Sequence, residues 1–131
     1  MGFDIIAAEI VLMLKDAPRL SGSVELICAV PFIEQSESFT EEWKKRYNDV
    51  IARADEVILI SDKYFTGCYR KRNEFMVNNS DYVITWYDGK AGGTGNTLKY
   101  AQKKNKRIIN LSESGVHEYQ SADGYEIIEG Y

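Results

Sequence analysis

The sequence predicts an α/β protein, with an open, mainly parallel sheet flanked by helices and a short C-terminal β-hairpin. Two observations predict this class. Short, nearly continuous apolar runs alternate with stretches of helical periodicity, and the last part of the chain alternates polar and apolar residues instead. A length of 131 residues suits a single core. We therefore expect an α/β domain over residues 1–111, followed by a hairpin extension over 112–131.

The elements follow one another in a regular order. After Asp4, a stretch rich in helix formers and apolar on most sides predicts a largely buried helix over 5–15. The apolar run 24–30 suits a strand covered on both faces, and further strands are expected at 57–60, 82–86 and 107–111. Thr40 is expected to cap an amphipathic helix that runs to Ala54, and two more helices are expected at 69–78 and 95–104. Every crossover is then a right-handed βαβ unit.

The tail carries a hairpin signal around an Asp123-Gly124 pair, with short strands expected on either side of it. Composition points to a soluble protein, with 44% hydrophobic and 27% charged residues. The apolar run that contains Glu9 is well short of the ~20 residues that a membrane span needs. Two cysteines and the lack of a secretory pattern favour the cytoplasm.

Charge is distributed unevenly along the chain. The net charge of −4 disfavours non-specific binding to nucleic acid. Residues 1–65 carry 7 basic and 12 acidic groups, 66–110 carry 9 and 3, and 111–131 carry 0 and 5. The middle segment, at +6, has two interpretations: solvated helix faces, or a local field that attracts an anionic ligand.

A glycine-rich loop lies at the end of the third predicted strand and opens the next helix. Glycines permit close approach of a ligand to the backbone, and free N–H groups at a helix start favour an anion such as phosphate. The loop lacks the Gly-Lys-Ser/Thr ending of a Walker A motif and the spacing of the dinucleotide fingerprint. A turn without a ligand is the alternative, but the context favours phosphate or ribose. The loop residues are Gly92, Gly93, Thr94, Gly95, Asn96 and Thr97.

Other polar residues are possible ligand contacts. Arg72 and Asn73 lie near a predicted helix start, where they are either solvated or reach the ligand held by the loop. Asp4, Glu9 and Asp88 are carboxylates with two interpretations. Either they bind ribose hydroxyls or act as a general acid or base, or each one caps a helix or is a solvated surface charge. The single histidine, His117, fits a surface position, and no metal-ligand spacing is present.

The motifs resemble those of the YpsA-type proteins, from residue 2 to about residue 111. The matching segments are Gly2-Phe3-Asp4 with Ala7-Ala8-Glu9, Ala29-Val30-Pro31-Phe32 with Gln35, Trp43 with Arg46-Tyr47, Ala54-Asp55-Glu56-Val57, Gly67-Cys68 with Lys71-Arg72-Asn73 and Met76-Val77, and Asp88-Gly89-Lys90 with the glycine loop.

That family belongs to the SLOG superfamily of Rossmann-like domains, which is related to the Lonely Guy phosphoribohydrolases and to the DNA-processing protein DprA. The resemblance implies a pocket for a nucleotide or for a ligand derived from NAD or ADP-ribose. Some SLOG domains look like sensors of such signals in bacterial defence systems. Together with the loop, the residues expected to contact the ligand are Asp4, Pro31, Phe32, Gln35, Arg72, Asn73 and Asp88.

Two departures from the related families affect the expected activity. Aligned on the glycines, Lys99 stands where the Lonely Guy enzymes carry their catalytic glutamate, while Ala91 and Asn96 replace a proline and a threonine. In the second Lonely Guy motif, Arg72 and Met76 match, but Asn73 replaces a lysine. The chain also begins after the N-terminal unit with the Thr-Gly-His-Arg-Pro motif that full-length relatives carry.

The leading hypothesis is non-catalytic binding of a nucleotide-derived ligand such as ADP-ribose, NAD or a cyclic nucleotide, with no cofactor or metal. The first alternative is an enzyme that hydrolyses an N-glycosidic bond of a nucleotide with Glu9 or Asp88 as acid or base. The second is DprA-like binding of single-stranded DNA, which the negative net charge disfavours. Without the strands that precede the equivalent of Gly2 in the relatives, a sheet edge or an apolar face should be exposed, and exposed edges invite pairing. We therefore also expect a homodimer or larger homo-oligomer, and no membrane partner.

Overall fold

The computed structural model describes residues 2–20, 22–90, 92–112, 116–119 and 127–130. It divides the chain into two compact units, Met1–Cys68 and Tyr69–Tyr131, and each is described here by itself. Both units contain a parallel strand pair and the helices that pack on it, so the predicted α/β class is confirmed. The division into 1–111 and 112–131 stays a prediction. Among the described residues, no helix combines the length and the apolar character that crossing a membrane requires.

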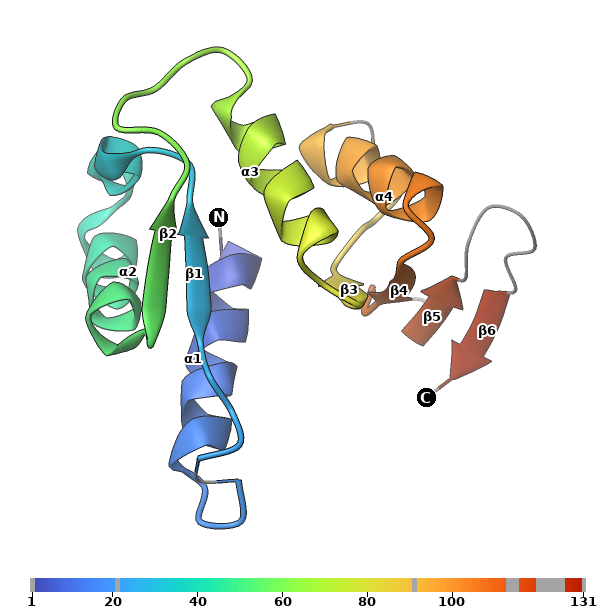
Figure 1. Cartoon of the computed structure of the whole chain (residues 1–131), viewed down its shortest axis with the longest axis horizontal. Helices are drawn as coiled ribbons and strands as arrows, with labels where there is room; N and C mark the ends of the chain where they lie inside the picture. The colour runs from blue at the N-terminus through green and yellow to red at the C-terminus, as the bar shows by residue number, and fades with distance from the viewer. Residues whose placement is uncertain (1, 21, 91, 113–115, 120–126, 131) are drawn as a thin grey trace. The chain divides into compact units, whose positions relative to one another are not determined.

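Unit 1 is built around two parallel strands that run side by side (Figure 1). The hydroxyl of Thr40 accepts a hydrogen bond from the Trp43 N–H at 3.4 Å, so the predicted helix cap is confirmed. The 3₁₀ helix, by contrast, was not expected from the sequence. The elements are α1 (Gly2–Asp16), β1 (Ile27–Val30), the 3₁₀ helix η1 (Ile33–Ser38), α2 (Glu41–Arg53) and β2 (Glu56–Leu59).

The core of unit 1 lies on one face of this strand pair. Ile5 and Leu12 of α1 form a buried cluster with Leu26 and Val50, and Cys28 of β1 packs against it. The neighbouring strand residue points to the opposite face because side chains alternate along a strand. That residue, Ile27, is 52% exposed, so the expectation of a strand covered on both faces is wrong for the described residues.

Helix α1 is only partly buried, contrary to the prediction. Its apolar residues surround the helix, but the cluster with α2 and β1 takes up one side of it. The other side presents an apolar stripe at helical spacing. This α1 stripe consists of the exposed residues Ile6, Ile10, Met13 and Leu14.

Ion pairs fix α1 to the rest of unit 1. Arg46 of α2 donates hydrogen bonds to both carboxylate oxygens of Glu9, and these bonds hold the pKa of Glu9 below its ordinary value. Lys15 donates to Asp55 Oδ1 at 2.5 Å, while Asp55 Oδ2 accepts the Leu26 N–H at 2.8 Å. The bond from Lys15, followed by that from Leu26, lowers the pKa of Asp55. Both carboxylates are therefore structural anions.

Unit 2 contains a four-stranded sheet in the order β3-β4-β5-β6. Strands β3 and β4 are parallel, and β5 and β6 form the predicted antiparallel hairpin (Figure 1). Strand β5 also pairs with β4, which was not predicted, so the hairpin continues the sheet. The Asp123-Gly124 turn lies outside the described residues, as does the side chain of His117. The elements are α3 (Cys68–Asn78), β3 (Tyr82–Thr85), α4 (Gly93–Lys103), β4 (Arg107–Asn110), β5 (Val116–Tyr119) and β6 (Ile127–Gly130).

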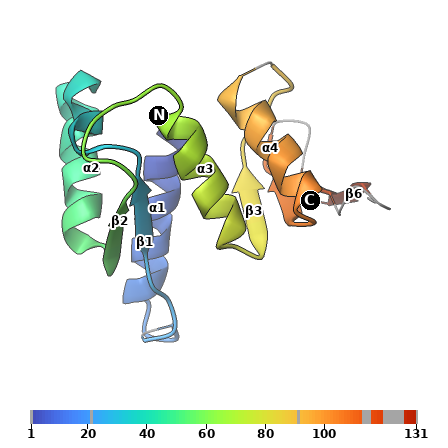
Figure 2. The ribbon, with the colours of Figure 1, turned by 45° about the horizontal axis from the view of Figure 1, so that its top comes forward.

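The core of unit 2 also lies on one face of its parallel strands. Helices α3 and α4 meet β4 in a buried cluster, and a short turn leads from α3 into β3 (Figure 2). The cluster consists of Val77, Leu98, Ala101 and Ile108. On the opposite face, β3 and the residue that follows it present large apolar side chains to solvent. This β3 face consists of Tyr82, Ile84 and Trp86, which are 55%, 57% and 49% exposed.

We predict that acid destabilises unit 1 through Glu9 and Asp55. The folded carboxylates stay ionised to lower pH than the ordinary values of 4.5 and 3.8, at which the unfolded chain takes up protons. Stability that is fully present above these values is therefore lost as the pH falls through them toward the lowered pKa values. Thermal unfolding followed by circular dichroism should show this decline, and it should be shallower in Glu9→Gln.

The control is Glu41→Gln, because the Glu41 side chain is 94% exposed. It should retain the full pH dependence. A Glu9→Gln profile identical to that of the unmodified chain would contradict the structural role of the Arg46–Glu9 pair.

Candidate functional site

The glycine loop forms the start of α4. The helix begins at Gly93, two residues earlier than predicted, and Gly92 is its N-cap with φ +153°, a conformation that favours glycine. The first helical hydrogen bond runs from the Asn96 N–H to the Gly92 carbonyl at 3.1 Å. The N–H groups of Gly93, Thr94 and Gly95 consequently have no helical acceptor, and the helix dipole makes this end attractive to an anion.

The loop has open space around its first two glycines and is closely packed at its third. No described atom lies within 4 Å of where a Cβ would stand at Gly92 or Gly93, whereas a Cβ at Gly95 would be 2.8 Å from the Tyr87 hydroxyl. Thr94 is exposed, but the hydroxyl of Thr97 donates within the helix, to the Gly93 carbonyl at 2.9 Å. The backbone N–H groups of the first turn are therefore available to donate to a ligand, whereas the Thr97 hydroxyl proton is already donated to Gly93.

A buried side chain positions this loop. Asn110, at the end of β4, is 4% exposed. Its Oδ1 accepts the N–H groups of Tyr87 and Ser112 at 3.0 and 3.2 Å, and its Nδ2 donates to the Tyr87 carbonyl at 3.0 Å. The amide thus joins the chain that leaves β3 to the end of β4. We missed this residue in the sequence, where its one signal was a polar side chain in an apolar strand.

Asp88 closes a turn in the same loop. Its Oδ1 accepts the Lys90 N–H at 3.0 Å, Lys90 Nζ lies 3.7 Å from Oδ2, and Gly89 between them has φ +91°. The side chain is 55% exposed. Asp88 therefore shapes the loop and still presents a carboxylate to solvent at the carboxyl end of β3.

Arg72 and Asn73 lie on α3, in the same unit as the loop. Arg72 Nε donates to Asn73 Oδ1 at 2.8 Å, and no other partner of this guanidinium is found among the described residues. Helices α3 and α4 begin at the same end of unit 2 (Figures 1 and 2) and are joined by a 2.8 Å hydrogen bond from the Tyr100 hydroxyl to Asn78. Arg72 and Asn73, however, lie midway along α3, and their contact with a ligand at the loop stays a prediction.

The remaining predicted residues belong to unit 1. Pro31 is buried directly after β1, and the Phe32 ring packs edge-on against Tyr64 at 5.5 Å. Gln35 lies in η1, and Asp4 is exposed in the first turn of α1. Their use together with the glycine loop, which belongs to unit 2, stays a prediction.

Glu9, the other acid or base of the enzyme alternative, is engaged by Arg46, whose guanidinium lies 4.2 Å from the centre of the Trp43 ring. A general acid must hold a proton near the working pH. An arginine-bound carboxylate with a lowered pKa is poorly suited to that role.

The positive charge found in the sequence is concentrated in unit 2. Between Gly89 and Ser112 the chain has basic residues and no acidic ones. These residues are Lys90, Lys99, Lys103, Lys104, Lys106 and Arg107. Within the described part of the chain, no group of His, Cys, Asp and Glu side chains is arranged to hold a metal ion.

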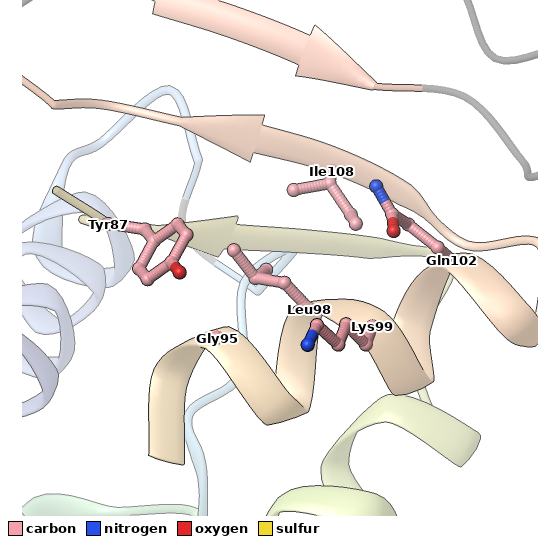
Figure 3. A pocket seen from close by; sticks show the side chains of 6 residues that line it. All are labelled: Tyr87, Gly95, Leu98, Lys99, Gln102 and Ile108. Atoms are coloured by element: carbon pink, nitrogen blue, oxygen red, sulfur yellow. The ribbon is translucent and has the colours of Figure 1, made fainter. Parts of the chain in front are cut away.

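A pocket of about 220 Å³ opens beside the first turns of α4 (Figure 3). It shares Gly95 with the loop, and its other walls come from the chain after β3, from α4 and from β4. None of these other residues was predicted as a site residue. The lining residues are Tyr87, Gly95, Leu98, Lys99, Gln102 and Ile108.

Comparison with known proteins assigns a family. The sequence model of the YpsA proteins, described as the YspA SLOG family, matches residues 1–117. The chain belongs to this family. The suspected resemblance is thus confirmed over the α/β elements and as far as β5.

The relatives are bacterial proteins of uncharacterised function. A UPF0398 protein of Halalkalibacterium halodurans is 31% identical over 110 residues, which cover 82% of this chain and 57% of the relative. The uncharacterized SPbeta prophage-derived protein YoqJ of Bacillus subtilis is 34% identical over 92 residues, or 61% of this chain and 54% of that protein. A UPF0398 protein of Brevibacillus brevis is 31% identical over 108 residues, with coverages of 79% and 55%. This YspA SLOG chain therefore spans just over half the length of these relatives.

We predict that Asn110→Ala destabilises unit 2 and loosens the loop. Removing the amide leaves buried N–H and C=O groups at Tyr87 without partners, which costs about 2 kcal/mol. Urea unfolding should show this loss, and amide hydrogen exchange should accelerate at Tyr87 and Asp88. The matched control, Asn96→Ala, removes an exposed amide from α4 and should leave both measurements unchanged. Equal stability of Asn110→Ala and Asn96→Ala would refute the positioning role.

Proposed function

We propose that this protein binds a nucleotide-derived anion at the start of α4 and does not turn it over. The ligand class is that of ADP-ribose, NAD or a cyclic nucleotide signal. The observation that carries the proposal is the open first turn of α4, whose three N–H groups have no helical acceptor, within a stretch that has six basic and no acidic residues. Free N–H groups and a helix dipole bind phosphate well.

The absence of turnover is supported by the side chains nearest the loop. Lys99 stands where the Lonely Guy enzymes have a catalytic glutamate, and an ammonium group cannot replace a carboxylate as a base at neutral pH. Asp88 is the remaining exposed carboxylate at this loop among the described residues, and it is already paired with Lys90. Membership of a SLOG family adds support for a ligand of the nucleotide class.

We predict that Gly93→Asp abolishes binding while the fold is retained. A Cβ at Gly93 has open space beyond its own helix turn, and an aspartate in the first turn of a helix is favourable to the helix. Its charge, however, occupies the place where the phosphate would bind. Calorimetry with ADP-ribose, NAD, AMP and cyclic nucleotides should give binding heat for the unmodified chain and at least a tenfold loss in Gly93→Asp.

Gly93→Asn is the matched control, since it has nearly the same volume without the charge. It should bind within a few-fold of the unmodified chain. No heat with any of the nucleotides would disprove the proposal. Release of free base from the nucleotide, detected by chromatography and lost in Asp88→Asn, would establish the hydrolase alternative instead.

We also propose that a second copy of the chain covers the β3 face. Parallel sheets are normally covered on both faces, and Tyr82, Ile84 and Trp86 lie exposed on the face opposite to the α3 and α4 cluster of unit 2. A second copy brings an apolar helix surface of the kind required, the α1 stripe, whose residues are 43% to 71% exposed. Reciprocal contacts of this kind close into a symmetric dimer.

Light scattering at micromolar concentration should therefore give a dimer. Ile84→Glu and Met13→Lys, which place charges on the two surfaces, should each give a monomer. The exposed residue Glu41 provides the control, and Glu41→Lys should remain dimeric. A monomeric unmodified chain would contradict the proposal.

A further inference from the structure

We infer that the pocket beside α4 is a second subsite, which holds the heterocyclic base of the ligand whose phosphate binds at the start of that helix. This inference rests on the proposed function and adds to it the part of the ligand that distinguishes a nucleotide from a simple phosphate. Of the residues expected from the sequence to contact the ligand, only Gly95 of the loop lines this pocket.

The floor of the pocket is apolar and belongs to the core of unit 2. Leu98 and Ile108 belong to the buried cluster of unit 2 and are 8% and 1% exposed. The Tyr87 ring forms a wall, and its backbone is held on both sides by the Asn110 amide. A flat aromatic wall beside aliphatic side chains suits a planar ring system, which gains from stacking and from leaving water.

The rim of the pocket carries polar groups that form no hydrogen bond with the described residues. Lys99 and Gln102 are three residues apart on α4, a spacing at which side chains are neighbours, and both line the pocket. Within the described residues, the Lys99 ammonium, the Gln102 amide and the Tyr87 hydroxyl have no hydrogen-bond partner. An amide offers both a donor and an acceptor, which is what the edge of a base requires. Few polar groups around an apolar floor are typical of ligand pockets.

The size and position of the pocket limit the ligand. A volume of about 220 Å³ is below the ~300–1,000 Å³ of pockets that enclose a drug-sized molecule, so it accepts one ring system and not a whole dinucleotide. Gly95 belongs both to the pocket and to the first turn of α4, and Lys99 follows about one helical turn, or ~5.4 Å, further along. A ligand whose phosphate binds at the loop and whose base occupies the pocket would therefore lie along the side of α4.

The test compares two probes, ribose 5-phosphate and AMP, by calorimetry and by amide NMR. The base should add at least about tenfold to the affinity of the phosphate, and AMP alone should shift the side-chain amide signals of Gln102. Gln102→Leu keeps the volume and removes the amide, so it should lower the affinity for AMP about tenfold and leave ribose 5-phosphate unchanged. Asn48→Leu removes an exposed amide from α2, outside the pocket, and is the matched control.

The outcomes separate this inference from the proposed function. If ribose 5-phosphate binds and AMP binds no more tightly, or if Gln102→Leu weakens both probes equally, the base subsite is refuted while the phosphate site stands. If neither probe binds, both proposals fail. Circular dichroism of Gln102→Leu confirms that the comparison is made on a folded chain.

Discussion

Both units depend on the burial of one face of a short parallel strand pair under helices. Four-residue strands have too few ladder hydrogen bonds to be stable by themselves, and isolated two-stranded pairs are marginal in water. In unit 1 the required apolar contact comes from Ile5 and Leu12 of α1, and in unit 2 it comes from Leu98 and Ala101 of α4. The same packing fixes where the next helix starts. The first turn of α4 therefore lies at the carboxyl end of β3, the edge of a parallel sheet at which ligands bind.

Hydrogen bonding decides the shape of the loop once packing has placed it. The chain that leaves β3 must turn toward α4, and the partly buried backbone groups at Tyr87 need hydrogen-bond partners there. Asn110 satisfies the N–H and the carbonyl together, so the backbone there has one favoured position. Asp88 and Gly89 then make the turn. The open N–H groups of α4 are consequently held in place before any anion arrives, which lowers the cost of binding.

The sequence predicted the elements of the fold more completely than it predicted their surroundings. Periodicity and the Thr40 cap located the helices and strands, because these signals are local. The exposure of Ile10 and Met13 was missed, since a helix that is apolar on most sides does not reveal which side has a partner. The role of Asn110 depends on pairing with Tyr87, 23 residues away in the chain, which no local pattern records. At the site, the loop was located, but glycine's low helix propensity placed the start of α4 two residues late.

Lys99 connects the charge distribution to the proposed absence of catalysis. An enzyme accelerates hydrolysis only through interactions that are stronger in the transition state than with the bound substrate. In the proposed site, the lysine on the rim of the pocket attracts an anionic ligand and offers no carboxylate for the developing positive charge of a sugar ring. With no acidic residue between Gly89 and Ser112 to offset it, the electrostatics of this segment favour retention of the anion over its conversion. A site of this kind is suited to the proposed sensing or sequestering of a signal, because both require that the bound ligand is not converted.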